Sequence, residues 1–261
     1  TKPSLLLEPQ STNLITYSED LSQWTLQNGG TGINPVVTVD NAISPDGTRN
    51  ADRIVFNSGS GTTSGDSSQI TNIVSISSGT DATASIYLKG ENGGEEIVFR
   101  GVADGTYTKL TLTKEWQRFS TTENSGTNTD AITFGIRQNV SGLGTINSSA
   151  TVYAWGGQIE TLTYPTSLIP TNGSTQTRAA ETCNGAGTSS IFESSEGILF
   201  YEFKTNNTGL VSVTLFSSDN DKILIYGNTG NSIVFRIRVG GSYVYTHTKV
   251  GLDLKNTQKA A

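Results

Sequence analysis

Short runs of alternating apolar and polar residues recur along the chain, and Gly, Asn, Asp or Ser separates almost every pair of runs. Alternation with a period of two predicts strands, whereas no segment keeps apolar residues at helical spacing for three turns. One short turn of helix is expected within residues 20–26. The strands predicted in the first two thirds of the chain are Val36–Val39, Asp52–Phe56, Ile70–Ile76, Ala82–Lys89, Glu96–Arg100, Tyr107–Leu112, Trp116–Ser120, Ala131–Gln138 and Ala150–Glu160.

Strands at this spacing, with no helices between them, indicate an all-β sandwich or jelly roll. A polar, Gly-rich stretch at residues 171–190 predicts a linker between a first domain, 1–170, and a second, 191–261. The second domain is short for two full sheets, so we expect an incomplete sandwich or a small sheet. Its predicted strands are Gly197–Phe203, Val211–Phe216, Lys222–Tyr226, Ile233–Val239 and Tyr243–Val250.

The composition argues against two classes of function, nucleic-acid binding and membrane insertion. Only 34% of the residues are hydrophobic, 15% are charged, and the net charge is −6. No Lys/Arg cluster is long enough to follow a phosphate backbone, so no nucleic-acid binding is expected. No apolar run approaches the roughly 20 residues that span a bilayer, so no membrane insertion is expected. The absence of Met and the start at Thr1 favour a piece of a longer polypeptide.

Catalytic constellations are scarce. His247 is the only histidine, and it alternates with threonines as a surface residue of a strand does. Glu95 and Glu96 are adjacent, so a strand directs them to opposite faces and they cannot act as a facing pair of carboxylates. Cys183 lies in the polar stretch and is interpreted as a linker thiol. We therefore expect a protein that is not an enzyme.

The sequence contains the residue types that bind carbohydrates. Sugars stack their C–H surfaces on aromatic rings and form hydrogen bonds from their hydroxyls to amide, acidic and guanidinium groups. Tyr87, Phe99 and Trp116 are further aromatic candidates, with core or edge packing favoured for Trp116. Trp155, alternating with Tyr153, is predicted to be a core residue. The candidate carbohydrate-binding residues are Tyr107, Trp24, Asn92, Arg100, Arg137 and Gln138.

Two strings frame the first domain. The opening string runs Leu5-Leu6-Leu7-Glu8-Pro9-Gln10, and the closing string runs from Tyr164-Pro165-Thr166-Ser167 to Thr171. Together they resemble the frame of a jelly-roll module, similar to carbohydrate-binding modules, that recurs in bacteriophage tail-fibre and other virion proteins. The resemblance covers roughly residues 4–180; Leu168 departs from it where the family more often has an aromatic. Residues 191–261 resemble the opening strands of a concanavalin/laminin-G-like domain.

The resemblance implies a virion structural protein at the particle surface, a tail fibre or another appendage. Its expected partners are other virion proteins, further copies of itself (a trimer or symmetry-related copies) and a host surface polysaccharide. It implies either no cofactor or a structural calcium ion near the first and last strands, where Glu8 and Glu160 occupy the matching places. Two alternatives stay open: a binding module of a secreted bacterial enzyme or adhesin, or a purely architectural virion domain.

Overall fold

The computed structural model describes residues 7–102, 106–126, 130–182, 201–203, 211–216, 218–228, 232–252 and 258–260. The chain divides into two compact units, Thr1–Cys183 and Asn184–Ala261. All described strand pairings are antiparallel, and the one helical element described is the 3-10 turn η1, Leu21–Gln23. The predicted all-β class is confirmed, as is the turn of helix within residues 20–26.

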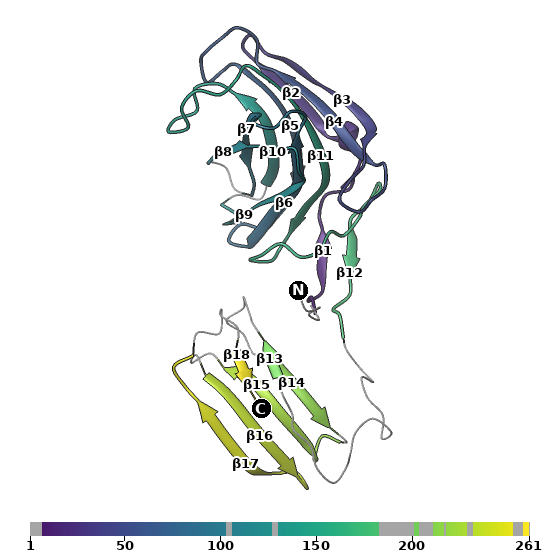
Figure 1. Ribbon diagram of the computed structural model, residues 1–261, viewed down its shortest axis with the longest axis vertical. Coiled ribbons are helices and arrows are strands. Elements are labelled where there is room, and N and C mark those ends of the chain that lie inside the picture. Colours follow the sequence, from purple (N-terminus) through teal and green to yellow (C-terminus); the bar gives the residue numbers. More distant parts are fainter. Residues whose placement is uncertain are drawn as a thin grey trace. The chain divides into compact units, whose positions relative to one another are not determined.

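Unit 1 is a sandwich of two five-stranded sheets (Figure 1). Sheet I has the order β2-β5-β10-β7-β8, from Thr25–Gly29, Ser67–Val74, Asp130–Arg137, Glu96–Arg100 and Thr108–Thr111. Sheet II has the order β3-β4-β11-β6-β9, from Ile33–Ala42, Ala51–Asn57, Ser149–Glu160, Asp81–Gly90 and Gln117–Asn124. Consecutive strands fall on different sheets at several points, which is the crossing connectivity of a jelly roll.

The core lies between the two sheets. Ile70 and Phe134 of sheet I meet Ile54 and Phe56 of sheet II in one buried cluster. The rings of Phe56 and Phe134 pack edge to face with centroids 5.9 Å apart, a favoured aromatic geometry. In β4 and β10, every second residue enters this core, as the alternation in the sequence predicts. The strands β3, β8 and β9 contribute few buried residues.

The first half of the predicted linker differs from the prediction. β12, Gln176–Arg178, pairs with β1, Ser11–Asn13, and Tyr17 bridges to Asn172, so residues 171–182 belong to unit 1. The polar composition concealed this because the contact is made by backbone pairing and hydroxyl groups, such as Thr12 with Thr177 at 2.8 Å. The rest of the predicted linker, with Cys183, lies outside the described residues.

Unit 2 contains a four-stranded sheet of neighbouring strands and a separate two-stranded pair. Its described core is small: Ile225 and Ile233 are buried, with Phe235 and Leu252 packed against them. The four-stranded sheet is β14 Val211–Phe216, β15 Lys222–Asn228, β16 Ser232–Val239 and β17 Ser242–Lys249, and the pair is β13 Tyr201–Phe203 with β18 Gln258–Ala260.

In the described parts of the chain there is no helix with the length and apolar character needed to cross a membrane.

Candidate functional site

The outer face of sheet I carries an aromatic ring flanked by two cations. Ile132, Phe134 and Ile136 of β10 enter the core, so Arg137 lies on the opposite, outer face. Arg100 of β7 lies on the same face, since it pairs with Thr133. Both guanidinium carbons approach the ring of Tyr107, at 5.3 Å from Arg100 and 5.5 Å from Arg137. These separations are those of cation–π contacts.

The Tyr107 hydroxyl is held by the same face. Gln69 donates to it through Nε2 at 3.2 Å, and Arg137 donates through Nη1 at 3.4 Å. On the same outer face, the Thr71 and Thr133 hydroxyls share a hydrogen bond of 2.8 Å. We call the outer surface formed by Gln69, Arg100, Tyr107 and Arg137 the Tyr107 face. It combines a ring with amide, hydroxyl and guanidinium groups that have further hydrogen-bonding capacity.

The structure thus brings together three of the six predicted carbohydrate-binding residues, Tyr107, Arg100 and Arg137. Asn92 is exposed but lies apart, in the turn between β6 and β7, where its backbone N–H donates to Glu95 at 2.6 Å. That turn precedes β7, whereas Arg100 ends it, so the length of the strand separates Asn92 from the Tyr107 face.

Trp24 and Gln138 do not belong to this surface. Trp24 is only 4% exposed; its ring packs edge to face on Phe134 at 6.3 Å, and its Nε1 donates to the Tyr17 carbonyl at 2.8 Å. Its ring therefore offers no face to a sugar. Gln138 follows Arg137 and is 6% exposed; its amide donates to Ser58 Oγ at 3.0 Å. Burial therefore separates both residues from the Tyr107 face. The sequence did not show it, because Trp24 precedes β2 and Gln138 follows the last residue of β10, so neither lies within a strand.

The two glutamates predicted to bind calcium accept hydrogen bonds from adjacent residues, Glu160 from Thr166 and Glu8 from Ser167. Glu8 accepts from the Ser167 N–H at 2.8 Å and pairs with Arg178 at 2.6 Å. Glu160 is fully buried. It accepts hydrogen bonds from the Ser11 hydroxyl at 2.6 Å, from the Gln158 amide at 2.7 Å, and from both the N–H and the hydroxyl of Thr166.

This donor set does not fit calcium, which requires six to eight oxygen ligands. The carboxylate oxygens of Glu8 and Glu160 face N–H and O–H donors and a guanidinium instead. In the described residues, no three acidic, His or Cys side chains gather as a metal-binding group. The two glutamates therefore act as hydrogen-bond acceptors that tie the opening and closing strings of unit 1 together.

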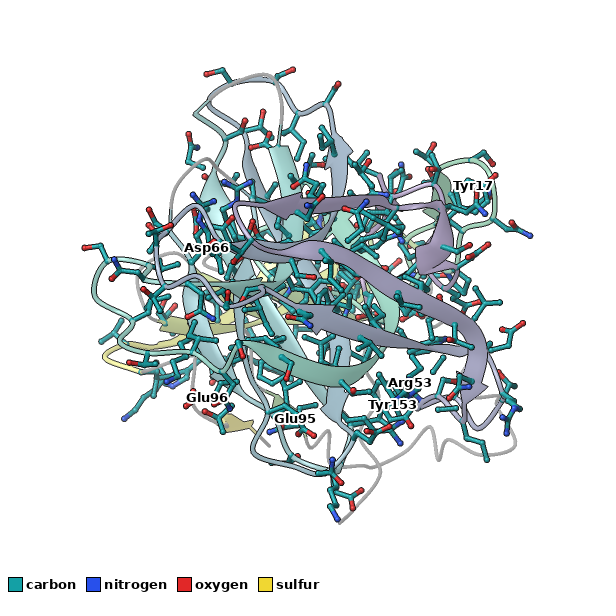
Figure 2. The ribbon with its side chains drawn as sticks, turned by 90° about the horizontal axis from the view of Figure 1, so that it is seen from above. Tyr17, Arg53, Asp66, Glu95, Glu96 and Tyr153 are labelled. Carbon is teal, nitrogen blue, oxygen red and sulfur yellow. The ribbon has the colours of Figure 1, made fainter. Side chains whose placement is uncertain are left out.

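Two buried aspartates have perturbed acidity but serve the scaffold. Burial raises the pKa of Asp52 to about 6, although its carboxylate accepts backbone N–H bonds from Leu21 and Asp40. The pKa of Asp66 is lowered, first by the N–H of Thr31 and then by the hydroxyl and N–H of Thr63. Asp66, labelled in Figure 2, thereby joins the loop between β2 and β3 to the loop between β4 and β5. Neither group touches the Tyr107 face through a described hydrogen bond.

A second cluster of aromatic and cationic residues lies on the outer face of sheet II. Lys89 of β6 pairs across the ladder with Tyr153 of β11, which pairs in turn with Arg53 of β4. Figure 2 shows Arg53 and Tyr153 side by side. The Lys89 Nζ lies 5.1 Å from the Tyr153 ring centroid and 5.0 Å from that of Trp116. Sequence reasoning missed Lys89 and Tyr153, although their alternation with Leu88 and Ala154 marks them as outward-facing.

Trp155 is buried, as predicted, with 5% of its surface exposed. It is not part of the cluster between the sheets, however. It pairs with Tyr87 on the outer face of sheet II, with ring centroids 5.4 Å apart. Its neighbour Gly156 lies against Leu168. Leu168 therefore lies next to the residue that follows Trp155 in β11.

No family model matches the sequence, and no curated protein matches it. Among solved structures, TmCBM61 in complex with β-1,4-galactotriose has 14% identity and a TM-score of 0.38, over 56% of this chain and 97% of that one. The family 11 carbohydrate-binding module from Clostridium thermocellum has 16% identity and a TM-score of 0.37, over 62% and 97%.

A third match is the enzymatically active domain of tailspike protein 4 from bacteriophage CBA120, with 12% identity and a TM-score of 0.36. It involves 56% of this chain and only 21% of the tailspike. The description of unit 1 as a sandwich rests on its strand pairing and does not use these matches. At these identities and TM-scores the matches add nothing about a ligand.

Proposed function

We propose that unit 1 is a non-catalytic binding module that holds a glycan on the Tyr107 face. The observation that carries this proposal is the packing of two guanidinium groups, from Arg100 and Arg137, against the ring of Tyr107. A ring that is fixed in this way loses little conformational freedom when a ligand binds. Preorganisation of this kind raises affinity.

The chemistry of the Tyr107 face suits a polyhydroxylated ligand. The Tyr107 ring can stack against sugar C–H groups, while Arg137 and the Gln69 amide can bond to hydroxyl groups. Both side chains already bond to the Tyr107 hydroxyl. Their remaining donors therefore start from fixed positions.

We further propose that the chain is a structural protein of a phage virion, a tail fibre or other appendage, and that the glycan belongs to the host surface. The support is the pair of framing strings, which in the structure lie together: Glu8 of the opening string bonds to Ser167 of the closing string. On this proposal the protein works as one of several identical copies. The likeness of residues 191–261 to a concanavalin/laminin-G-like domain remains a prediction.

The test is binding of the full chain to an array of bacterial capsular and O-antigen polysaccharides. Tyr107→Ala should reduce binding to any uncharged glycan that the wild type retains by about tenfold or more, since one stacking contact with its hydrogen bond is worth roughly 1.4 kcal/mol or more. Tyr107→Phe should retain most of the binding, because it keeps the ring.

The matched control is Tyr243→Ala in unit 2. Tyr243 also lies against two guanidinium groups, those of Arg236 at 4.9 Å and Arg238 at 5.6 Å, so its truncation removes a similar side chain elsewhere. Equal binding by the wild type and a folded Tyr107→Ala variant would refute the assignment of the Tyr107 face. Absence of binding to every polysaccharide would favour the architectural alternative.

A further inference from the structure

The outer face of sheet II presents two rows of aromatic and cationic side chains. The first row is Arg53, Tyr153 and Lys89, with Trp116 beyond Lys89. The second row is Trp155, Tyr87 and Arg118, paired strand to strand. The guanidinium carbon of Arg118 lies 5.3 Å from the Tyr87 ring centroid. We call the surface formed by Tyr87, Lys89, Trp116, Arg118 and Tyr153 the Lys89 face.

The Lys89 face carries positive charge that no neighbouring carboxylate in the described part of the chain neutralises. Arg53 at its margin is neutralised by Glu91, whose carboxylate lies 2.9 Å from the guanidinium. Lys89 and Arg118 form no ion pair with any carboxylate among the described residues. In a chain with a net charge of −6, this leaves two cations together on one sheet face.

Both cations are held in place by neutral groups. The Lys89 ammonium lies between the rings of Trp116 and Tyr153 and has no described hydrogen bond. Arg118 donates through Nη2 to Ser85 Oγ at 2.9 Å, while its Nε is buried without a hydrogen-bond partner among the described residues. Aromatic rings orient a cation but do not neutralise it. Each cation therefore retains the capacity to bind an anionic group.

The two cations are also spaced for an extended ligand. Arg118 pairs with Tyr87 across adjacent strands, and Lys89 is two residues farther along. With strands about 4.8 Å apart and a rise of about 3.4 Å per residue, their backbones are about 8 Å apart. A polymer with repeated anionic groups can reach both positions, whereas a single carboxylate reaches only one.

We propose that the Lys89 face is a second binding site, which takes an acidic polysaccharide. Carboxylate groups of the polymer pair with Lys89 and Arg118, and its sugar rings pack against the exposed parts of Trp116 and Tyr153. The Lys89 face is on sheet II and the Tyr107 face is on sheet I, so the sandwich presents one binding surface on each of its two sheets. This site does not depend on glycan binding at the Tyr107 face.

The probe is polygalacturonate, with neutral dextran for comparison, titrated into the full chain by calorimetry. The wild type should bind polygalacturonate and not dextran at this face, and the affinity should fall as salt is added, because surface charges are screened over about 10 Å at 0.1 M ionic strength. Lys89→Gln and Arg118→Gln should each weaken binding by about tenfold, the loss expected for one charge-assisted hydrogen bond. Lys89→Arg should bind like the wild type.

Two control variants distinguish binding at the Lys89 face from a general effect of positive charge and from binding at the Tyr107 face. Lys249→Gln removes one positive charge from an exposed position in unit 2 and should leave binding unchanged. Tyr107→Ala should also leave polygalacturonate binding unchanged, whatever it does to binding of other glycans. The proposal is overturned if polygalacturonate does not bind, if Lys89→Gln and Arg118→Gln bind as the wild type does, or if only Tyr107→Ala abolishes the binding.

Discussion

Replacement of Trp24 by alanine tests whether this residue belongs to the scaffold or to a binding surface. The side chain is 4% exposed, and a buried tryptophan removes 150–250 Å² from water, worth about 4–6 kcal/mol at 25 cal/mol per Å². The alanine side chain still buries a small part of this apolar area. The denatured chain also buries some of the area already, so the loss of free energy is smaller than the full value. The lost bond from Nε1 to the Tyr17 carbonyl adds about 1 kcal/mol. We therefore expect unit 1 to lose about 3–5 kcal/mol of unfolding free energy.

The void left by this substitution lies next to Gly157, which packs directly against the ring. A Cβ atom on Gly157 would lie 2.5 Å from Trp24 Cζ2, and glycine has no side chain that could move into the vacated space. Since one kcal/mol shifts the melting temperature of a domain of this size by about 2–4 °C, the expected decrease is about 6–20 °C.

Differential scanning calorimetry is the suitable assay, because it resolves the transitions of two units, which a single two-state fit does not. Trp116→Ala is the matched control: this half-buried tryptophan on the outer face of sheet II should cost much less stability. A Trp24→Ala protein with unchanged melting and weakened glycan binding would refute the buried placement and restore Trp24 as a sugar-binding residue.

Two further predictions concern the carboxylates. Burial raises the folded-state pKa of Asp52 from 3.8 to about 6, so the folded protein prefers the protonated form; this stabilisation is complete below pH 3.8 and is lost as the pH rises through about 6. Asp52→Asn should remove this part of the pH dependence, and equal pH dependence of the melting temperature in both proteins would contradict it. Because the Glu8 and Glu160 oxygens accept protein hydrogen bonds, calcium and a chelator should leave the melting temperature of unit 1 unchanged. A rise of several degrees with calcium would show that these glutamates bind the ion.

The sequence predicted the strands of unit 1 that have strong alternation, and it missed those that do not. β6 and β10 have apolar residues, among them isoleucines and a phenylalanine, at every second position. Because these residues fill the core, the sequence shows the alternation that predicts a strand. β2, Thr25–Gly29, contains a single large apolar residue, Leu26. It is a strand because β5 pairs with it through the backbone, and no periodicity in the sequence records that pairing.

The candidate site was predicted in part for a similar reason. Arg100 and Arg137 end strands whose inward residues are clearly apolar, so their outward direction follows from alternation. Trp24 precedes β2 and lies outside any alternating run. Only the fold shows that its ring packs against Gly157 and Phe134. Lys89 and Trp116 come from different parts of the chain, and their contact depends on a pairing of β6 with β9 that the sequence alone does not specify.

Chemical-shift mapping by NMR shows directly whether the Tyr107 face holds the glycan. The isotope-labelled full chain is titrated with the uncharged polysaccharide that it retains best on the array. We expect the largest saturable shifts on Tyr107, Arg100 and Arg137 and on the neighbouring residues of β7, β8 and β10. Shifts confined to other surfaces of unit 1 or to unit 2 would contradict it.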